Sequence, residues 1–219
     1  MKINPRICLI ISFALFLGGC GESSVGNIYL VYKDLTAPKK MSSITREEIN
    51  NNPYGTISIN YESKAPSIMV LGYVNFENEL QYMSSNDLSI VTRFGRIIKT
   101  IGFTEDLVDT IFVGSDPLED KPHLIKNSVK YTRIVSFGGD VPWQGNLQCE
   151  VVNEGPELIT VVELDFETIR LVEECKGVKW WRVKNTFWVD AYSGLVWKSY
   201  QILFTKEPRI ELNTLKPLG

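Results

Sequence analysis

Histidine is almost missing from this 219-residue chain, and its scarcity removes a common source of catalytic chemistry. His123 is the only histidine. A Ser-His-Asp triad would have to use it, yet no G-x-S-x-G nucleophile elbow is present. No group of histidines and cysteines has the spacing of a zinc site. We therefore expect His123 to be an exposed loop residue, and we expect no catalytic residue, no metal and no cofactor.

The chain also lacks an excess of basic residues and lacks a long apolar run after its N-terminal segment. The chain has 23 Lys and Arg against 26 Asp and Glu, a formal net charge of −3. Proteins that bind nucleic acids usually carry a basic surplus, so no nucleic-acid partner is expected. Beyond the N-terminal segment, no apolar run approaches the roughly 20 residues of a membrane-spanning helix. The sequence therefore predicts no transmembrane helix after that segment.

The N-terminal segment has the features of an export signal. The chain begins MKINPRICLIISFALFLGGCGESS, with Lys2 and Arg6 ahead of an apolar run from Ile7 to Leu17. At about a dozen residues this run is too short to span a bilayer. A positive start, a short apolar core and small residues at a cleavage site are typical of a secretory signal peptide.

The end of this segment, Leu17-Gly18-Gly19-Cys20, has the form of a lipobox, the cleavage signature of bacterial lipoproteins. Cleavage would leave Cys20 as an acylated N-terminus, and its acyl chains would anchor the protein firmly because each buried CH₂ contributes about 0.8 kcal/mol. Gly21 follows instead of aspartate, which by resemblance to enterobacterial sorting favours the outer membrane and a periplasm-facing domain. The alternative is an ordinary signal peptide with a chance cysteine.

Three segments follow from this interpretation. Residues 1–19 are the removed signal peptide, residues 20–27 are the lipid anchor and a short tether, and residues 28–219 are a single β-rich domain. The mature chain of 200 residues is long enough to bury a sizeable core. Removal of the signal takes away two basic residues and no acid, which leaves 21 basic and 26 acidic residues and a net charge of −5.

Only two of the four cysteines remain as candidates for a disulfide. Cys8 leaves with the signal and Cys20 carries lipid, so Cys149 and Cys175 remain in a protein bound for an oxidising compartment. An even remainder there indicates a disulfide. The bridge requires directly paired strands, a curled sheet, or a position for Cys175 in the turn near Gly177. A flat meander would place the two segments as its first and third strands, about 10 Å apart. We favour the last two arrangements, because Lys176-Gly177 is a turn signal.

The mature chain starts with helical signals. Residues 28–35, IYLVYKDL, predict one short helix. A second begins at Ile44 or Thr45, with Ser43 or Thr45 as its cap and two glutamates in the first turn, where the helix dipole favours acids. Both helices would be brief.

From residue 56 onward the pattern changes to period two. Short segments rich in Ile, Val, Tyr and Phe are separated by Gly, Asn, Ser and Pro, which predicts antiparallel strands joined as hairpins. One exception is the segment TEDLVDTIF, residues 104–112, which we interpret as a helical turn capped by Thr104. The sequence therefore predicts a mostly β protein after a short helical start.

Three stretches resemble the group 4 capsule polysaccharide lipoproteins of the GfcB/YjbF type: SSITREEINNNPYGTI (42–57), LSIVTRFGRIIKTIGF (88–103) and NTFWVDAYSGLVWKSYQ (185–201). The likeness covers most of the mature chain in order, although residues 104–177 follow it loosely. The resemblance implies an outer-membrane lipoprotein encoded with a capsule or exopolysaccharide export system. It also implies a strongly curved antiparallel sheet or an incomplete β-barrel or sandwich, with one or two short N-terminal helices.

The first strand motif offers two arginines as candidate contacts. Gly95 can take the positive φ of a tight hairpin turn, although Phe94 before it is a poor residue for a type I′ turn and a bulged turn is equally acceptable. Arg93 and Arg96 flank this turn. They are candidates for contact with an anion or an acidic sugar. The competing interpretation is a solvated turn with weak surface ion pairs.

The last motif divides into two faces. One face carries Trp181, Val183, Asn185, Phe187 and Val189 and, apart from Asn185, is predicted to be core. The other face carries two tryptophans and two cations that could contact glycan or a partner: Trp180, Arg182, Lys184 and Trp188. Tryptophan combines an apolar ring with a hydrogen-bond donor, which suits stacking on a sugar. Alternatively, these tryptophans belong to the core.

Three functions compete. The leading hypothesis is a non-enzymatic accessory factor in capsule or exopolysaccharide assembly or export, with export or assembly proteins or the polysaccharide itself as partners. The alternative is a carrier or binder of an apolar, lipid-like ligand, which would need an unfilled cavity in the curved sheet. The third is an envelope glycan hydrolase, which would need two carboxylates facing each other across a cleft.

Overall fold

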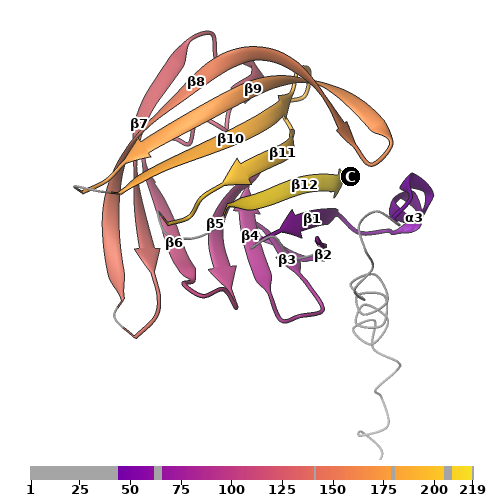
Figure 1. Ribbon diagram of the computed structural model, residues 1–219, viewed down its shortest axis with the longest axis horizontal. Helices are drawn as coiled ribbons and strands as arrows, with labels where there is room; N and C mark the ends of the chain where they lie inside the picture. Colours follow the sequence, from indigo (N-terminus) through magenta and orange to yellow (C-terminus); the bar gives the residue numbers. More distant parts are fainter. Residues whose placement is uncertain (1–43, 62–65, 141, 179–180, 205–208, 219) are drawn as a thin grey trace, which may run out of the picture. The chain divides into compact units, whose positions relative to one another are not determined.

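A computed structural model describes residues 44–61, 66–140, 142–178, 181–204 and 209–218 (Figure 1). This part is mostly β, with one short α-helix, α3 (Arg46–Asn51), and one 3-10 turn, η2 (Pro122–Leu124). No helix among the described residues has the length and apolar character needed to cross a membrane. The helix predicted at residues 28–35 and the lipidation site Cys20 lie outside the described residues.

Twelve strands form one antiparallel sheet in the order β5-β4-β3-β2-β1-β12-β11-β10-β9-β8-β7-β6. Neighbours in the sheet are neighbours in the chain, except where β1 pairs with β12. The strands are β1 (Thr56–Asn60), β2 (Ser67–Val74), β3 (Leu80–Met83), β4 (Ser89–Arg93), β5 (Arg96–Ile101), β6 (Leu107–Val113), β7 (Ser128–Phe137), β8 (Trp143–Val161), β9 (Leu164–Lys176), β10 (Arg182–Asp190), β11 (Val196–Gln201) and β12 (Ile210–Lys216).

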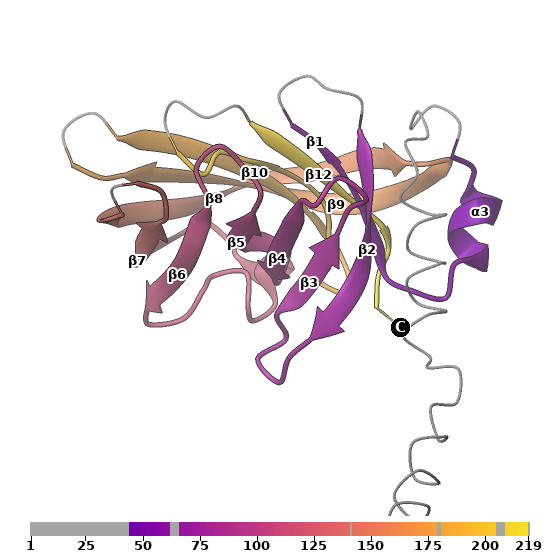
Figure 2. The ribbon, with the colours of Figure 1, turned by 90° about the horizontal axis from the view of Figure 1, so that it is seen from below.

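The sheet curls until its two edge strands, β5 and β6, lie side by side (Figure 2). Side chains bridge this seam: the Thr110 hydroxyl donates to the Ile98 carbonyl at 3.2 Å, and the Leu107 amide donates to Thr100 Oγ1 at 2.8 Å. No main-chain ladder joins β5 to β6 in the described part of the chain. The fold is therefore a nearly closed barrel, as the family resemblance implied.

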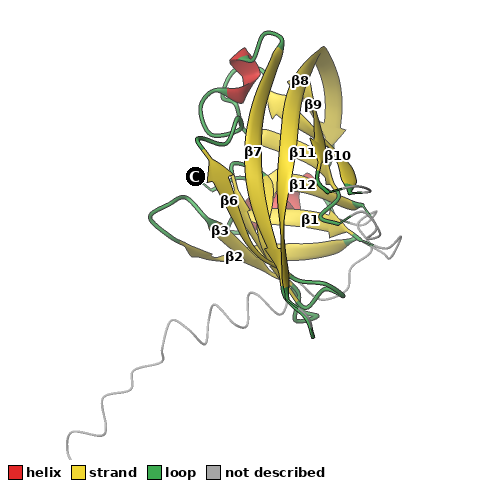
Figure 3. Ribbon diagram, turned by 90° about the vertical axis from the view of Figure 1, so that its left-hand side faces the viewer, coloured by secondary structure: helices red, strands yellow, loops and turns green. Residues whose placement is uncertain are grey.

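Side chains occupy the centre of the barrel. One apolar cluster lines β7–β11 and includes Leu147, Leu171 and Phe187, none of which exposes measurable surface. A second cluster lines β1–β5 and β12, around Met69 and Ile90. The long strands β7 and β8 form one wall of this core (Figure 3). The described interior is therefore packed, unlike the open cavity that an apolar-ligand carrier would need.

Helix α3 confirms the predicted capped helix and covers the outer face of the sheet. Thr45 and Glu48 form a reciprocal capping box, and Ile49 is the buried residue of the helix. Ile49 packs with Ile68, Leu215 and Val161, and Val161 comes from the tip of the β8–β9 hairpin. Figure 1 shows this hairpin reaching over β11 and β12 toward α3.

The helical turn predicted at residues 104–112 is wrong. Residues Leu107–Val113 form strand β6, which pairs with β7. Its Val, Thr, Ile and Phe residues favour a pleated, half-buried surface, and pairing with β7 outweighs the local acidic cap. Thr104 lies just before the strand, where Asp106 accepts backbone hydrogen bonds from Gly102 and Phe103.

The predicted disulfide is present, with Cys149 and Cys175 joined at an S–S distance of 2.05 Å. The favoured explanations for it are wrong, because the cysteines face each other on directly paired strands, β8 and β9. The sequence pattern predicts short strands here, in residues 146–153 and 157–165. They instead belong to one 19-residue strand, interrupted only by a bulge at Gly155, whose φ is +100°.

Candidate functional site

The β4–β5 turn carries the first candidate residues. Phe94 and Gly95 both have positive φ, +51° and +79°, and Arg93 pairs directly with Arg96. The turn is therefore a two-residue hairpin turn of the type that twisted strands favour. A Cβ on Gly95 would lie 2.4 Å from the Cβ of Val196, so only glycine fits. Phe94 is strained, since bulky residues rarely adopt positive φ.

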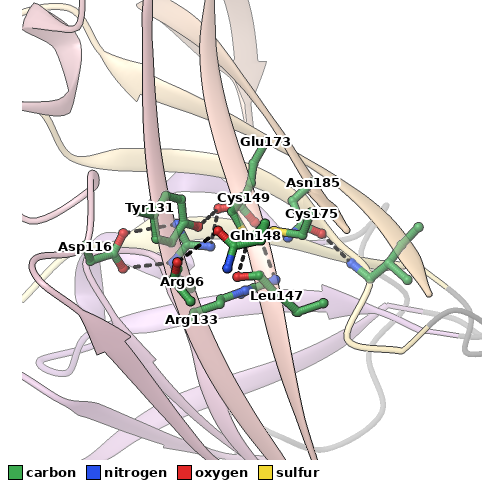
Figure 4. Close-up of a disulfide and its surroundings, with 12 residues drawn as sticks. Arg96, Asp116, Tyr131, Arg133, Leu147, Gln148, Cys149, Glu173, Cys175 and Asn185 are labelled. Carbon is green, nitrogen blue, oxygen red and sulfur yellow. Dashed lines mark hydrogen bonds and ion pairs between the residues drawn. A yellow bond between two sulfur atoms is a disulfide. The ribbon is translucent and has the colours of Figure 1, made fainter. Parts of the chain in front are cut away.

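Arg96 points from this turn into the barrel and exposes no surface. Its guanidinium binds both oxygens of Asp116, with Nε–Oδ2 at 2.8 Å and Nη2–Oδ1 at 3.1 Å. Its Nη1 lies 2.7 Å from Oε1 of Glu173, a close ion pair whose angles are not those of a hydrogen bond. Figure 4 shows Arg96 held between the two carboxylates.

Glu173 is the centre of this network. It accepts hydrogen bonds from the Tyr131 hydroxyl and, at 2.6 Å, from the Asn185 amide, and Arg133 Nη2 lies 3.5 Å away. Burial alone would raise the pKa of the Glu173 carboxyl. The charges of Arg96 and Arg133 and the two hydrogen bonds outweigh burial and lower this pKa to about 2. Glu173 therefore stays ionised inside the protein.

Aromatic rings and the disulfide enclose the network. The Arg96 guanidinium carbon lies 5.1 Å from the ring centre of Phe187 and 5.5 Å from that of Phe112. Cys149 pairs with Tyr131 across β7 and β8. Two arginines face two carboxylates, so the buried charges balance. Because both carboxylates are held by arginine, neither is available as a general base.

A surface groove of about 640 Å³ lies beside the network, at the seam between β5 and β6. We call it the seam groove. The β2–β3 turn, the β4–β5 turn, β6 and the loop after β6 supply its lining: Phe76, Glu77, Asn78, Glu79, Arg93, Phe94, Lys99, Asp109, Thr110, Ile111, Phe112, Gly114, Asp116 and Glu119. Asp116 and Phe112 thus belong both to the groove and to the buried network.

The turn at Phe94 separates the seam groove from a second hollow of about 380 Å³. This hollow lies between the β4–β5 turn, the loop holding η2 and the β10–β11 turn, and it shares Asn78, Phe94 and Glu119 with the seam groove. His123, in η2 beside Gly194, is partly buried rather than exposed as predicted, and its Nδ1 is buried without a hydrogen-bond partner. The described residues contain no group of three or more His, Cys, Asp or Glu that could hold a metal ion.

The predicted contact residues do not form one open surface. Arg96 was expected at the surface but is fully buried, because its side chain pairs with the buried carboxylates of Asp116 and Glu173. Trp188 is only 7% exposed, with the Tyr200 ring edge-on at 5.0 Å and Lys198 Nζ at 5.6 Å. The alternative of core packing therefore holds for Trp188. Trp180 lies outside the described residues.

The remaining candidates lie apart. Arg182 and Lys184 are exposed on β10, and Lys184 forms a surface ion pair with Glu174 at 3.4 Å. Arg93 lines the seam groove, on a different part of the barrel. The predicted core residues of this strand are confirmed, since all four are at most 4% exposed: Trp181, Val183, Phe187 and Val189. Asn185, which was not predicted to be core, is also buried, at 1% exposed.

The sequence did not predict four members of the network: Asp116, Tyr131, Arg133 and Glu173. One signal was available for Glu173. It lies between Leu171 and Cys175 at two-residue spacing, so the period-two pattern places a carboxylate on the core face of its strand. A charge in that position needs a buried partner.

Comparison with known proteins agrees with this architecture. The family model "Group 4 capsule polysaccharide lipoprotein gfcB, YjbF" matches residues 29–215. The uncharacterized lipoprotein GfcB of Escherichia coli strain K12 is 28% identical over 98% of this chain and 99% of its own length. The uncharacterized lipoprotein YjbF of the same strain is 22% identical over 73% of this chain and 74% of its own.

A solved structure gives the same fold. The crystal structure of the hypothetical lipoprotein YmcC from Escherichia coli K12 matches with a TM-score of 0.78 and 24% sequence identity, and the match covers 91% of this chain and 98% of that one. The nearly closed twelve-stranded barrel is thus shared with a solved lipoprotein. Because the family model spans most of its length, the chain belongs to the group 4 capsule polysaccharide lipoprotein family.

Proposed function

We propose that this protein is a non-enzymatic accessory factor in the assembly or export of a surface polysaccharide, held by lipid on Cys20 in the outer membrane and facing the periplasm. The family match over residues 29–215 carries the proposal. The lipobox at residues 17–20 and the lipoprotein names of the relatives support the anchor. Its partners are export or assembly proteins, or the polysaccharide itself.

The barrel interior supports a binding role over the two alternatives. A lipid carrier needs apolar space, whereas apolar side chains and an ionic network occupy the described centre of this barrel. A glycan hydrolase needs two carboxylates free to act on a bound sugar, whereas arginines hold the two buried carboxylates, Asp116 and Glu173. The accessible features are on the surface, where a partner or a glycan chain can reach them.

Deletion of the gene tests the proposal. Surface polysaccharide should fall when the gene is deleted under conditions in which the pathway is expressed, and a plasmid copy of the wild type should restore it. A Cys20→Ala copy provides the matched comparison, because it keeps the domain and removes the acyl acceptor. An unchanged amount of polysaccharide in the deletion strain would refute the proposed function.

A further inference from the structure

The seam groove contains several charged groups without a partner in the described part of the chain. The carboxylates of Glu77, Asp109 and Glu119 line it, and none of them has a hydrogen-bond or ion-pair partner in the described part of the chain. Arg93 lies over the Phe112 ring at 5.2 Å, and its Nε is buried without a partner. Buried polar atoms are normally satisfied, so Arg93 is available to a ligand.

Aromatic surface lies beside these polar groups. Phe76, at the tip of the β2–β3 turn, is 94% exposed, the highest value among the exposed large apolar residues of the described chain. Phe112 and Phe94 add partly buried rings. Phe94 keeps its strained positive φ between the two hollows, and such strain concentrates at ligand sites. The volume of about 640 Å³ lies in the usual range of ligand pockets.

The mixture of groups restricts the ligand. Three free carboxylates against one free guanidinium repel a polyanion, because Lys99 is already paired with Glu79 at 3.5 Å. A purely apolar ligand would leave the carboxylates and Arg93 desolvated without partners, which is costly. A sugar satisfies both constraints, since its hydroxyls donate to carboxylates and accept from arginine while its C–H face covers an aromatic ring.

We propose that the seam groove binds uncharged sugar residues of the exported polysaccharide. Phe76 stacks on a sugar face, Glu77, Asp109 and Glu119 accept hydrogen bonds from hydroxyls, and Arg93 donates to a hydroxyl or ring oxygen. This assignment rests on the proposed function for the origin of the sugar. The proposed site lies at the seam between β5 and β6, whereas the glycan contact predicted from the sequence lay mainly on β10.

Calorimetric titration of the full-length lipoprotein in detergent tests the groove. The probe is a set of short oligosaccharides made by mild depolymerisation of the host's own surface polysaccharide, with polygalacturonate fragments as an acidic comparison. Phe76→Ala should weaken binding roughly fivefold, the value of one aromatic contact. The double variant Asp109→Asn, Glu119→Gln should weaken it about tenfold or more, because hydrogen bonds to charged groups are strong.

Two variants outside the groove provide matched controls. Leu158→Ala removes another exposed apolar side chain, and Glu174→Gln neutralises another exposed carboxylate. Both should bind as the wild type does, and the thermal midpoint of every variant should stay close to that of the wild type.

Three results would overturn the assignment: no binding of the host oligosaccharides, groove variants that bind as the wild type does, or tighter binding of polygalacturonate. Each leaves the proposed function standing if the deletion strain still loses polysaccharide. The opposite outcome is also informative. If the oligosaccharides bind in the groove but the deletion strain keeps its polysaccharide, the proposed function is refuted and the binding site stands.

Discussion

Arg96 shows how a single residue can join distant parts of this fold. Its carboxylate partners lie on the loop after β6 and on β9, and its own strand is one edge of the sheet. Burying charges costs solvation free energy, which close pairing and hydrogen bonds must offset. The intact network therefore adds little to the free energy of unfolding, whereas removal of one member lowers that free energy strongly.

Replacement of Arg96 by methionine should lower the free energy of unfolding by about 3–5 kcal/mol, because Asp116 and Glu173 would stay buried without their cation. Urea unfolding measures this change. The comparison variant Arg182→Met removes an exposed arginine from β10 and should change the free energy by less than about 0.5 kcal/mol. A loss below about 1 kcal/mol for Arg96→Met would show that the network relaxes or admits water.

Glu173 makes stability depend on acid pH. Its pKa is about 2 in the folded protein, below the 4.5 that is ordinary for a glutamate carboxyl. A carboxyl with a depressed folded pKa contributes stability that is complete above its unfolded pKa and is lost as pH falls toward its folded pKa. The free energy of unfolding should therefore decline as pH falls from about 5 toward 2.

The variant Glu173→Gln isolates this contribution. It should be less stable than the wild type at neutral pH, and its stability should change less between pH 5 and pH 2, when both are followed by urea unfolding at a series of pH values. Equal slopes for the two proteins over that interval would mean that other carboxyls control the acid response.

At the scale of elements, the β8–β9 hairpin is the longest feature and is fixed at two places. The Cys149–Cys175 disulfide ties its base beside the ionic network. At its tip, Val162 and Glu163 both have positive φ, and Val162 is β-branched, which makes this a strained turn. Arg46 of α3 donates to the carbonyls of Val161, Val162 and Leu215 and so holds the tip against the sheet.

Reduction of the disulfide should lower the free energy of unfolding by about 3 kcal/mol, within the 2–5 kcal/mol typical of small exported domains. The two strands pair along their length, so the reduced protein should keep its far-UV circular dichroism. Unfolding with and without a phosphine reductant measures the difference. The double variant Cys149→Ala, Cys175→Ala is the control, and its stability should not respond to the reductant.

Substitution of Arg46 by glutamine should release the hairpin tip. The loss of hydrogen bonds to three carbonyls should cost about 1–3 kcal/mol and should speed amide hydrogen exchange in residues 159–166 selectively. Exchange measured by mass spectrometry checks the location. Lys184→Gln, on the exposed face of β10, should leave that exchange unchanged, and equal exchange in the two variants would show that Arg46 does not hold the tip.

At the scale of the whole molecule, the sequence predicted those parts of the barrel in which apolar and polar residues alternate regularly along a strand. Alternation identified the strands and the inner face of residues 181–189, and the Thr45 cap identified α3. The burial of Arg96 was not predictable, because Glu173 is distant in the sequence and only the closed barrel brings them together. Strand β6 was missed for a similar reason, since its pairing with β7 outweighs a local helical signal.

The proposed lipid anchor at Cys20 has its own test. Replacement of Cys20 by alanine should block lipid attachment and leave an uncleaved or mislocalised precursor, because the acyl acceptor is gone. Membrane fractionation with mass analysis of the N-terminus measures this. A Cys8→Ala precursor is the matched control, since Cys8 lies inside the predicted signal peptide, and it should mature normally. Normal processing of the Cys20→Ala protein would refute the lipobox interpretation.

The pairing of β1 with β12 has a consequence for the order of assembly. Ser58 and Asn213, which hydrogen-bond across this pair, are 155 residues apart. During synthesis β1 is therefore made early and keeps one unpaired edge until the last strand follows. Contacts between distant residues make folding slow, and an unpaired edge invites association with other chains. The edge of β1 that faces β12 therefore stays open to association with other chains until the last strand has been made.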